Sequence, residues 1–309
     1  MSGPLSSELR APVRMQEIDP AKPAVAGMLK VLARTHQKQT AAFRPPVGLR
    51  MRQIAYPSKD GTEINAFVIE PEAEAAPLPG MLMLHGGAFY LPVQAGTLAL
   101  ACEYASRARI RVFVPDYRLT PSCPAPKALE DCMALWQKLC ASGPELGLDG
   151  SRLVVCGDSA GAALAAGLCI LLRDAGLPQP KRQLLIYPAL DDRDERYGSA
   201  AEYDGVVWSV KDTRAMWSAY LNGVDESLLP VLVPLRCEDL RGLPSAYVEP
   251  QEIDLLRDQG VAYAKALEAA GVNVELNIVE GSYHGFDSDL ASPLVQRVLA
   301  RRIAVLERQ

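Results

Sequence analysis

The sequence predicts an α/β fold: a mostly parallel sheet of eight strands, with helices on both faces and a helical cap. Its 309 residues, of which 49% are hydrophobic and 22% charged, are enough to bury a large core. Short apolar runs also alternate with helix-period patterns along most of the chain. This alternation is typical of parallel strands that are joined by helical crossovers.

The first two strands are predicted as a hairpin. Residues 49–56 and 63–70 read as strands and flank Asp60-Gly61, a pair that strongly favours a tight hairpin turn. They predict an antiparallel edge to the sheet. Six more strands are predicted at 81–84, 111–114, 153–156, 184–187, 246–249 and 274–279. Helices are predicted at 95–108, 125–140, 160–173, 256–270 and 293–308.

Two segments interrupt this alternation. Residues 1–45 are helix-like with proline breaks, and residues 191–229 combine an acidic turn with an aromatic, helix-like stretch. An open α/β sheet binds its ligand at the carboxyl ends of its strands, so we expect both segments to cover that edge. The predicted organisation is N-terminal cap helices at 1–45, an α/β domain at 46–190 and 230–309, and a cap insertion at 191–229.

Charge and hydropathy exclude several classes of protein. The net charge of −5 comes from 32 basic and 37 acidic residues without a run of like charge, so no nucleic-acid partner is expected. The longest apolar stretch, 160–172, is interrupted by Gly161 and Gly167 and is shorter than the roughly 20 residues of a membrane span. The N-terminus lacks the pattern of a signal peptide. We therefore expect a cytoplasmic protein with no membrane span.

The cysteines and histidines do not suggest a metal site. Seven cysteines occur without a C-x-x-C pair, which favours reduced thiols in the core. The three histidines are His36, His85 and His284. Neither a metal nor a cofactor is expected.

The strongest motif is Gly157-Asp158-Ser159-Ala160-Gly161, a G-x-S-x-G between a predicted strand and a predicted helix. A serine there lies on a strained turn that exposes its hydroxyl, and the flanking glycines leave room for the neighbouring strand and helix. The amides at the start of the following helix point to where an oxyanion would form. Ser159 is therefore the candidate nucleophile.

A serine nucleophile needs a base and a carboxylate that orients the base. His284 follows the last predicted strand, which places it at the same edge of the sheet as the serine. Asp254 lies a few residues beyond the strand at 246–249. Glu252 and Asp258 remain rivals for the acid, although Asp258 falls in a predicted helix and Glu252 has a longer side chain nearer to the strand end.

The run His85-Gly86-Gly87-Ala88-Phe89 follows the strand at 81–84. Its small residues allow backbone N–H groups to approach a tetrahedral intermediate, as an oxyanion hole requires. His85 is then expected to be structural, with its ring bonded to the backbone.

These motifs resemble those of the hormone-sensitive-lipase-like carboxylesterases, a family of α/β-hydrolases that carry HGG[GA] and GDSAG. The resemblance extends from residue 48 to the end of the sequence and includes 116–121, similar to DYRLAPE, and His284-Gly285-Phe286, which matches HGF. The run 254–258 resembles D-P-L-R-D, whose first Asp is the triad acid, so the resemblance favours Asp254.

The resemblance also implies which backbone groups form the oxyanion hole. The amides of Gly87, Ala88 and Ala160 would be the donors, with Gly86 lining the same loop. It further implies that the N-terminal segment and an insertion after the sixth strand form the cap. The sequence departs from the family at Pro92-Val93, where Gly-Ser is usual, which bears on the path of this loop.

The implied activity is that of a serine carboxylesterase that hydrolyses short- to medium-chain esters through an acyl-enzyme. A small-molecule ester is the expected partner, and formation of a homodimer is left open. The alternatives are an amidase or lactonase with the same triad, or a non-catalytic receptor similar to the plant gibberellin receptors, which tend to lose the triad histidine. Asp158 is interpreted as structural support for the loops. The candidate pocket residues are Phe89, Tyr187, Trp208, Met216, Trp217, Leu255 and Phe286.

Overall fold

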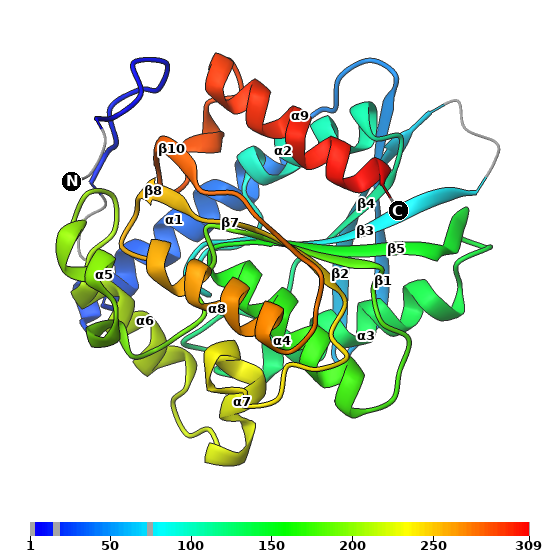
Figure 1. The fold of residues 1–309 in the computed structure, drawn as a ribbon. Coiled ribbons are helices and arrows are strands. Elements are labelled where there is room, and N and C mark those ends of the chain that lie inside the picture. Colours follow the sequence, from blue (N-terminus) through cyan, green and yellow to red (C-terminus); the bar gives the residue numbers. More distant parts are fainter. Residues whose placement is uncertain (1–3, 15–18, 73–76, 309) are drawn as a thin grey trace.

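An eight-stranded sheet forms the centre of the computed structural model, which describes residues 4–14, 19–72 and 77–308 (Figure 1). The strand order is β1-β2-β4-β3-β5-β6-β7-β9. Strand β2 is antiparallel to both β1 and β4, and the remaining neighbours are parallel, so the predicted fold class is confirmed. The strands are β1 (Leu49–Pro57), β2 (Glu63–Pro71), β3 (Leu78–Leu84), β4 (Arg111–Pro115), β5 (Leu148–Asp158), β6 (Arg182–Ile186), β7 (Ser245–Glu249) and β9 (Val274–Leu276).

Helices cover both faces of this sheet (Figure 1). The α-helices are α1 (Pro23–Ala42), α2 (Ala95–Arg107), α3 (Lys127–Ala141), α4 (Ala160–Asp174), α5 (Gly198–Glu202), α6 (Val210–Tyr220), α7 (Leu229–Leu232), α8 (Arg257–Ala269) and α9 (Pro293–Glu307). Helix α3 begins two residues later than the sequence predicts. Pro126 precedes it, and the N–H of Ala125 is bonded to the carbonyl of Tyr220 on α6 instead of entering a helix.

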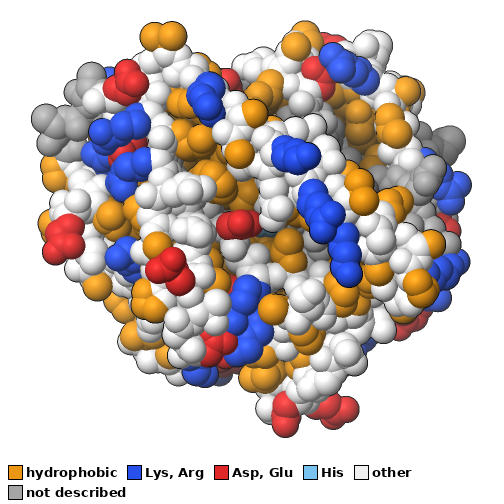
Figure 2. Space-filling view, turned by 180° about the vertical axis from the view of Figure 1, so that it is seen from behind, with side chains coloured by type: hydrophobic (Ala, Val, Ile, Leu, Met, Phe, Trp, Pro, Cys, Tyr) orange, Lys and Arg blue, Asp and Glu red, His pale blue; other side chains and the backbone are white. Residues whose placement is uncertain are grey.

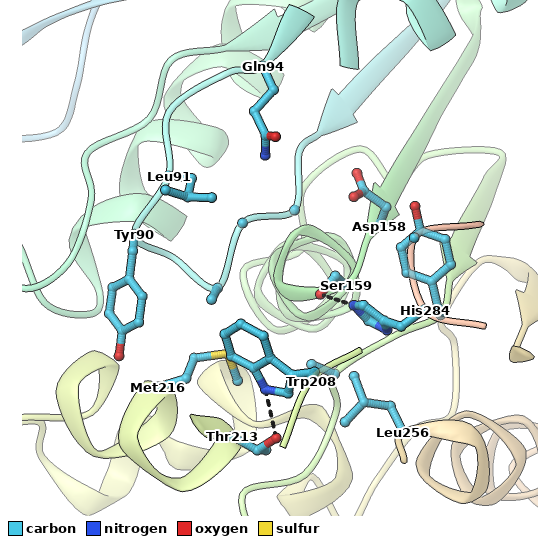
Figure 3. A pocket seen from close by; sticks show the side chains of 16 residues that line it. Tyr90, Leu91, Gln94, Asp158, Ser159, Trp208, Thr213, Met216, Leu256 and His284 are labelled. Carbon is cyan, nitrogen blue, oxygen red and sulfur yellow. Dashed lines mark hydrogen bonds between the residues drawn. The ribbon is translucent and has the colours of Figure 1, made fainter. Parts of the chain in front are cut away.

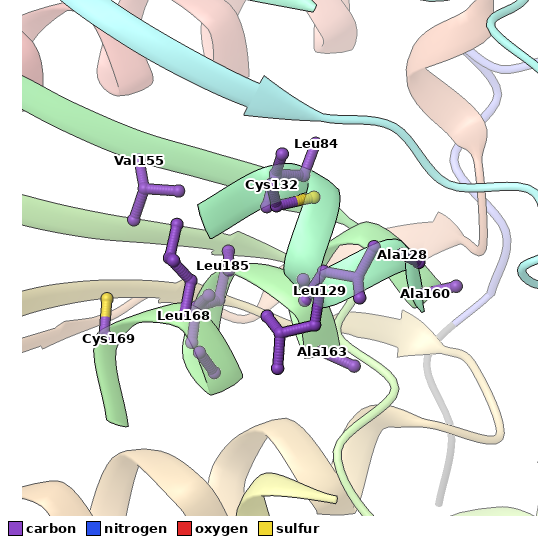
Figure 4. Close-up of a cluster of buried hydrophobic side chains, with 14 of the residues drawn as sticks. Leu84, Ala128, Leu129, Cys132, Val155, Ala160, Ala163, Leu168, Cys169 and Leu185 are labelled. Carbon is purple, nitrogen blue, oxygen red and sulfur yellow. The ribbon is translucent and has the colours of Figure 1, made fainter. Parts of the chain in front are cut away.

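Alternation along the strands creates two separate cores. On β3, Leu82 and Leu84 join the core formed with α3, α4 and α8, whereas Met81 and Met83 join the core formed with α2 and α9. This division follows from the period of two along a strand. Figure 4 shows the first core around α4, whose alanines allow the helix to lie close to the sheet.

Helix α4 is nearly all apolar because it is buried, not because it crosses a membrane. Twelve of its 15 residues are buried. Among residues 4–14, 19–72 and 77–308, no helix is long and apolar enough to span a membrane. The seven cysteines are free thiols. Acidic and basic side chains both occur across the face shown in Figure 2, in keeping with the mixed charge of the sequence.

The last predicted strand, 274–279, is two strands in the structure. Strand β9 pairs with β7, and the chain then leaves the sheet to form β10 (Val279–Tyr283). Strand β10 pairs in parallel with the short β8 (Gln251–Ile253), which follows β7. The sequence shows one apolar run here because both strands are short and only two residues separate them. This second, two-stranded sheet carries the acid and base candidates at its end.

The described part of the N-terminal segment is helical over part of its length. Of residues 1–45, 1–3 and 15–18 lie outside the described residues, and helix is present only in α1. Residues 4–10 run along β10 instead, where the N–H of Ser6 bonds the carbonyl of Gly281 and the hydroxyl of Tyr283 bonds the carbonyl of Arg10. Within 191–229, the helices are α5, α6 and two short 3₁₀ turns, and α5, α6 and α1 lie at the same end of the molecule as the β8–β10 pair (Figure 1).

Candidate active site

Ser159 lies in the sharp turn between β5 and α4. Its backbone has φ 54° and ψ −121°, a strained conformation for a residue with a side chain. The two glycines of the motif are required by space. A Cβ on Gly157 would collide with the carbonyl of Gly161, and a Cβ on Gly161 would collide with the carbonyl of Leu84 at the end of β3. The serine hydroxyl is thereby presented at the carboxyl edge of the sheet.

The structure brings Ser159, His284 and Asp254 into one hydrogen-bonded chain. The Ser159 Oγ lies 2.9 Å from His284 Nε2, and His284 Nδ1 lies 2.8 Å from Asp254 Oδ2 (Figure 3 shows the Ser159–His284 pair). The other carboxylate oxygen of Asp254 accepts the N–H of Leu256 at 3.0 Å. Asp254 is buried, and its two hydrogen bonds hold the carboxylate at one edge of the imidazole.

The charges around His284 favour the protonated ring. Burial opposes this charge, but the Asp254 carboxylate, followed by those of Asp158 and Asp287, raises the pKa of His284 above its usual value. The imidazole is therefore a stronger base than an isolated histidine.

The two rival carboxylates have other partners. Glu252 accepts the N–H of Gly281 at 2.6 Å and so fastens β8 to β10. Asp258 lies in the first turn of α8, where it accepts the N–H of Ser199 at 2.9 Å and an N–H of Arg257 at 2.8 Å. Neither is hydrogen-bonded to His284.

The loop after β3 turns its carbonyls away from Ser159. Gly87, Ala88 and Phe89 have φ values of 116°, 57° and 61°. The Gly87 carbonyl accepts the N–H groups of Tyr90 and Leu91, at 2.9 and 3.0 Å. In the described structure, no protein acceptor is paired with the amides of Gly87 and Ala88. These two donors are therefore available to a ligand, as an oxyanion hole requires.

Gly86 has a different role from that of its neighbours. Its amide donates to the Asp158 carboxylate, and a Cβ at this position would collide with that carboxylate. Burial, reinforced by the charge of Asp287, raises the pKa of Asp158 to about 7. Through its bond to the Gly86 amide, Asp158 holds the loop at 85–89, hereafter the oxyanion loop, against the serine turn. This geometry agrees with the supporting role expected for Asp158.

His85 supports the same loop from behind. Its Nδ1 lies 2.7 Å from the carbonyl of Gly86, and its ring stacks on Tyr117 with centroids 4.2 Å apart. The Tyr117 hydroxyl donates to the His85 carbonyl at 2.6 Å. Burial lowers the pKa of His85 to about 4, so the ring stays neutral. The motif around Tyr117 thus stabilises the oxyanion loop.

The Pro92-Val93 departure lies where α1 meets this loop. The Val93 carbonyl accepts the hydroxyl of Thr40 at 2.9 Å, and both residues are buried. The Val93 amide donates to Asp116. The path of the loop is therefore fixed from both sides without the usual glycine and serine.

A cavity with about 200 Å³ of free space opens above Ser159 (Figure 3). Three of the seven predicted pocket residues line it: Tyr187, Trp208 and Met216. The other lining residues are Gly86, Gly87, Ala88, Tyr90, Leu91, Gln94, Asp158, Ser159, Ala189, Thr213, Leu256, His284 and Gly285. Most of the exposed lining is apolar, which suits an uncharged organic substrate.

The other four predicted pocket residues face the interior. Phe89 stacks on Tyr220 with centroids 3.8 Å apart, and Trp217 packs beside both rings. Phe286 is fully buried against α9, and Leu255 is buried in the core beneath the site. Their size suggested a pocket wall, but their direction is set by packing that the sequence does not reveal.

Several lining residues escaped the sequence analysis. Tyr90, Leu91 and Gln94 follow the glycine run, where the chain turns back on itself, and all three line the cavity. Leu256 lines the cavity in place of its neighbour Leu255. Thr213 accepts the indole N–H of Trp208 at 2.9 Å and fixes that ring over the cavity (Figure 3). Proximity to the HGGA and DLLRD motifs was the available signal for the first four.

Comparison with known proteins shows which family the chain resembles. Residues 81–288 match a family model described as alpha/beta hydrolase fold. The chain is 33% identical over 293 residues to the carboxylesterase NlhH of Mycobacterium tuberculosis, covering 92% of this chain and 90% of that protein. It is 31% identical over 241 residues to an ethyl acetate hydrolase of Pseudomonas putida, covering 75% of this chain and 74% of that protein. The crystal structure of esterase LipW from Mycobacterium marinum superposes with a TM-score of 0.87 at 33% identity, covering 98% of this chain and 95% of that one.

Proposed function

Since this chain belongs to the α/β-hydrolase family and is a carboxylesterase of the hormone-sensitive-lipase-like group, we propose that Ser159, His284 and Asp254 are the triad with which it hydrolyses esters. The observation that carries the proposal is their continuous hydrogen-bond chain at the floor of an apolar cavity. Its completeness disfavours the receptor alternative, because a binding protein has no use for an aligned base.

The first half of the reaction forms the acyl-enzyme. The Ser159 oxygen attacks the ester carbonyl carbon while His284 Nε2 takes the hydroxyl proton. Asp254 holds the ring in the tautomer with the proton on Nδ1 and balances the charge of the imidazolium. The carbonyl oxygen becomes an oxyanion that accepts hydrogen bonds from the amides of Gly87, Ala88 and Ala160. The imidazolium then protonates the departing alcohol, and the carbon–oxygen bond to the alcohol breaks.

The second half releases the acid. A water molecule gives a proton to His284 and attacks the acyl carbon, the oxyanion forms again, and the Ser159 oxygen leaves with the proton returned by His284. Each proton taken by the imidazole is given back, so no cofactor is needed for the balance of the reaction.

We also propose that the substrates carry short to medium acyl chains. The cavity has about 200 Å³ of free space and apolar walls from Trp208, Met216 and Leu256. Each buried CH₂ contributes about 0.8 kcal/mol only while the pocket has room. The likeness to an ethyl acetate hydrolase supports small esters. Helix α1 and residues 191–229 would then act as the cap that limits the depth of the pocket.

A series of p-nitrophenyl esters tests the proposal. We expect kcat/KM to be highest for acyl chains of about four to eight carbons and to fall for longer chains. The Ser159→Ala variant should show no turnover, and its circular dichroism spectrum should be unchanged because only a hydroxyl is lost. An anilide and a lactone of matched size distinguish amidase and lactonase activity. Turnover by Ser159→Ala near that of the wild type would overturn the triad.

A further inference from the structure

A buried ionic cluster lies directly behind the base. Arg302 on α9 is 1% exposed, and its guanidinium pairs with Glu249 at the end of β7, at 2.6 and 3.1 Å. The same guanidinium donates to Asp287 Oδ2 at 2.8 Å. Both carboxylates are buried. Burying three charges is costly unless their geometry is fixed, and here every charge has a partner.

The cluster reaches the triad through Tyr187. The second oxygen of Asp287 accepts the Tyr187 hydroxyl at 2.8 Å, and the Tyr187 ring lies against the His284 ring with centroids 4.8 Å apart. Asp287 itself lies three residues after His284, in the 3₁₀ turn Phe286–Ser288. The base is thus held from two sides, by Asp254 at its Nδ1 and by the tyrosine ring, which packs beside it at an interplanar angle of 59°.

The backbone of Tyr187 indicates that this placement is enforced. Its φ is 34°, in a strained region of backbone conformation that tyrosine rarely occupies. Two contacts hold it there: its N–H donates to the Glu249 carbonyl at 2.8 Å, and its hydroxyl donates to Asp287. Burial raises the pKa of Tyr187 well above its usual value, so the phenol remains a donor. Strain that persists at a residue touching the base points to a functional role.

We propose that Tyr187, held by Asp287 and Arg302, is a positioning residue that fixes the His284 ring between the nucleophile and the acid. This inference rests on the proposed triad. Arg302 ties the loop that carries the base to the end of β7, from which the chain continues to the acid. Movement of either loop would lengthen a bond within the triad, and the cluster resists this movement.

The charged groups around the base set the expected pH behaviour. His284 faces Asp254 from the loop after β8, Asp158 from the end of β5 and Asp287 from its own loop, and Arg302 on α9 lies behind Asp287. The hydroxyl of Tyr187 adds no charge. Loss of this hydroxyl should therefore lower kcat with little change in the pH dependence of kcat/KM. Loss of the Asp287 charge should instead shift the acid limb of that pH dependence.

The principal test is Tyr187→Phe, which keeps the ring that lines the cavity and removes only the tether. We expect kcat on p-nitrophenyl acetate to fall about tenfold, with KM unchanged within about twofold. The matched control is Tyr197→Phe, which removes a tyrosine-to-aspartate hydrogen bond of 2.5 Å to Asp191, outside the cavity lining. Its kcat should equal that of the wild type. Wild-type kcat in Tyr187→Phe, or a rise in KM alone, would overturn the inference.

A second variant tests the charge. Asp287→Asn retains an acceptor for the Tyr187 hydroxyl and leaves the Arg302–Glu249 pair intact. Without this negative charge the imidazolium is less favoured, so the acid limb of the kcat/KM profile should move to lower pH. If the variant is folded and the acid limb of its kcat/KM profile stays where it is in the wild type, Asp287 does not influence the base.

Titration with a fluorophosphonate ester separates this inference from the proposed function. Covalent labelling of Ser159 in the wild type tests the triad independently of Tyr187. If the wild type is not labelled, the proposed function itself fails. If wild type and Tyr187→Phe are both labelled to one equivalent and turn over equally, the triad stands and the positioning role of Tyr187 fails.

Discussion

Asp254 and His284 leave two parallel strands at paired positions. Ile253 on β8 lies opposite Tyr283 on β10, and the next residue on each strand is a member of the proposed triad. The register of one short strand pair thereby sets the 2.8 Å bond between the acid and the base. A slip of one residue would exchange the faces of the strand and separate the two groups.

Asp254→Asn should lower kcat by about 10⁴-fold, since an amide favours the wrong tautomer of the histidine. Asp258→Asn and Glu252→Gln should each lower kcat by less than about tenfold, because their carboxylates bond Ser199 and Gly281 instead of His284. The measurement is kcat on p-nitrophenyl acetate. If either control were the more damaging change, the acid would be misassigned.

The pH dependence of kcat/KM should show an acid limb with its midpoint above about 6.5, the ordinary value for histidine. His284 must be neutral to accept the serine proton, and its pKa is raised by Asp254, Asp158 and Asp287 against the effect of burial. Activity is therefore present above the raised pKa and is lost as the pH falls through it. Initial rates at low substrate concentration between pH 5 and 9 provide the check. A midpoint below the ordinary histidine value would contradict this electrostatic account.

Leu256→Ala should move the substrate preference toward bulkier esters, because this side chain lines the cavity. Its neighbour provides the control. Leu255→Ala should lower the free energy of unfolding by about 2–5 kcal/mol without moving the preference, since Leu255 is buried in the core. The measurements are kcat/KM on ester panels in which the acyl chain and the alcohol are lengthened separately, and thermal unfolding. If both variants changed the substrate preference equally, the preference would not depend on the side chain of Leu256 in particular.

Gly161→Ala should reduce activity at least about 100-fold and destabilise the fold by about 1–3 kcal/mol, because the new methyl group meets the Leu84 carbonyl. The backbone that presents Ser159 must then move. Gly150→Ala is the control, since a Cβ there has no heavy atom within 4 Å. Ester turnover and chemical denaturation should separate the two variants. Wild-type turnover in Gly161→Ala would show that the turn is not sterically constrained.

Esters of tertiary alcohols should be hydrolysed slowly but measurably. The carbonyls of Gly86 and Gly87 are bonded away from the cavity, to His85, Tyr90 and Leu91, which leaves space near the leaving oxygen.

Replacement of Gly87 tests this space. Gly87→Val should suppress tert-butyl acetate more than ethyl acetate, because φ is 116° there and a Cβ would lie 2.9 Å from that of Leu91. Product release by gas chromatography measures both. Equal losses would mean that the loop sets only the oxyanion geometry, and no tertiary turnover in the wild type would refute the expectation.

Much of the scaffold could be predicted from contiguous residues. The order of strands and helices, the G-x-S-x-G turn at Ser159 and the glycine run at 85–88 depend on periodicity and on local backbone geometry. These are properties of a few neighbouring residues, so they can be read from the sequence. The position of His284 just after the last strand could be predicted for the same reason.

The walls of the site and the support of the base depended on contacts between distant residues. Leu256 lines the cavity and Leu255 does not, although both are buried leucines in the same turn. Arg302, Asp287 and Tyr187 form one buried assembly from three separate parts of the chain. In an irregular loop, the direction of a side chain is fixed by the residues that pack against it. A buried charge is stable only next to an opposite charge, and folding brings these partners together from distant parts of the chain. The sequence by itself therefore determined the turn that presents Ser159 and the chemistry proposed there, and the tertiary structure decided how that site is enclosed and held.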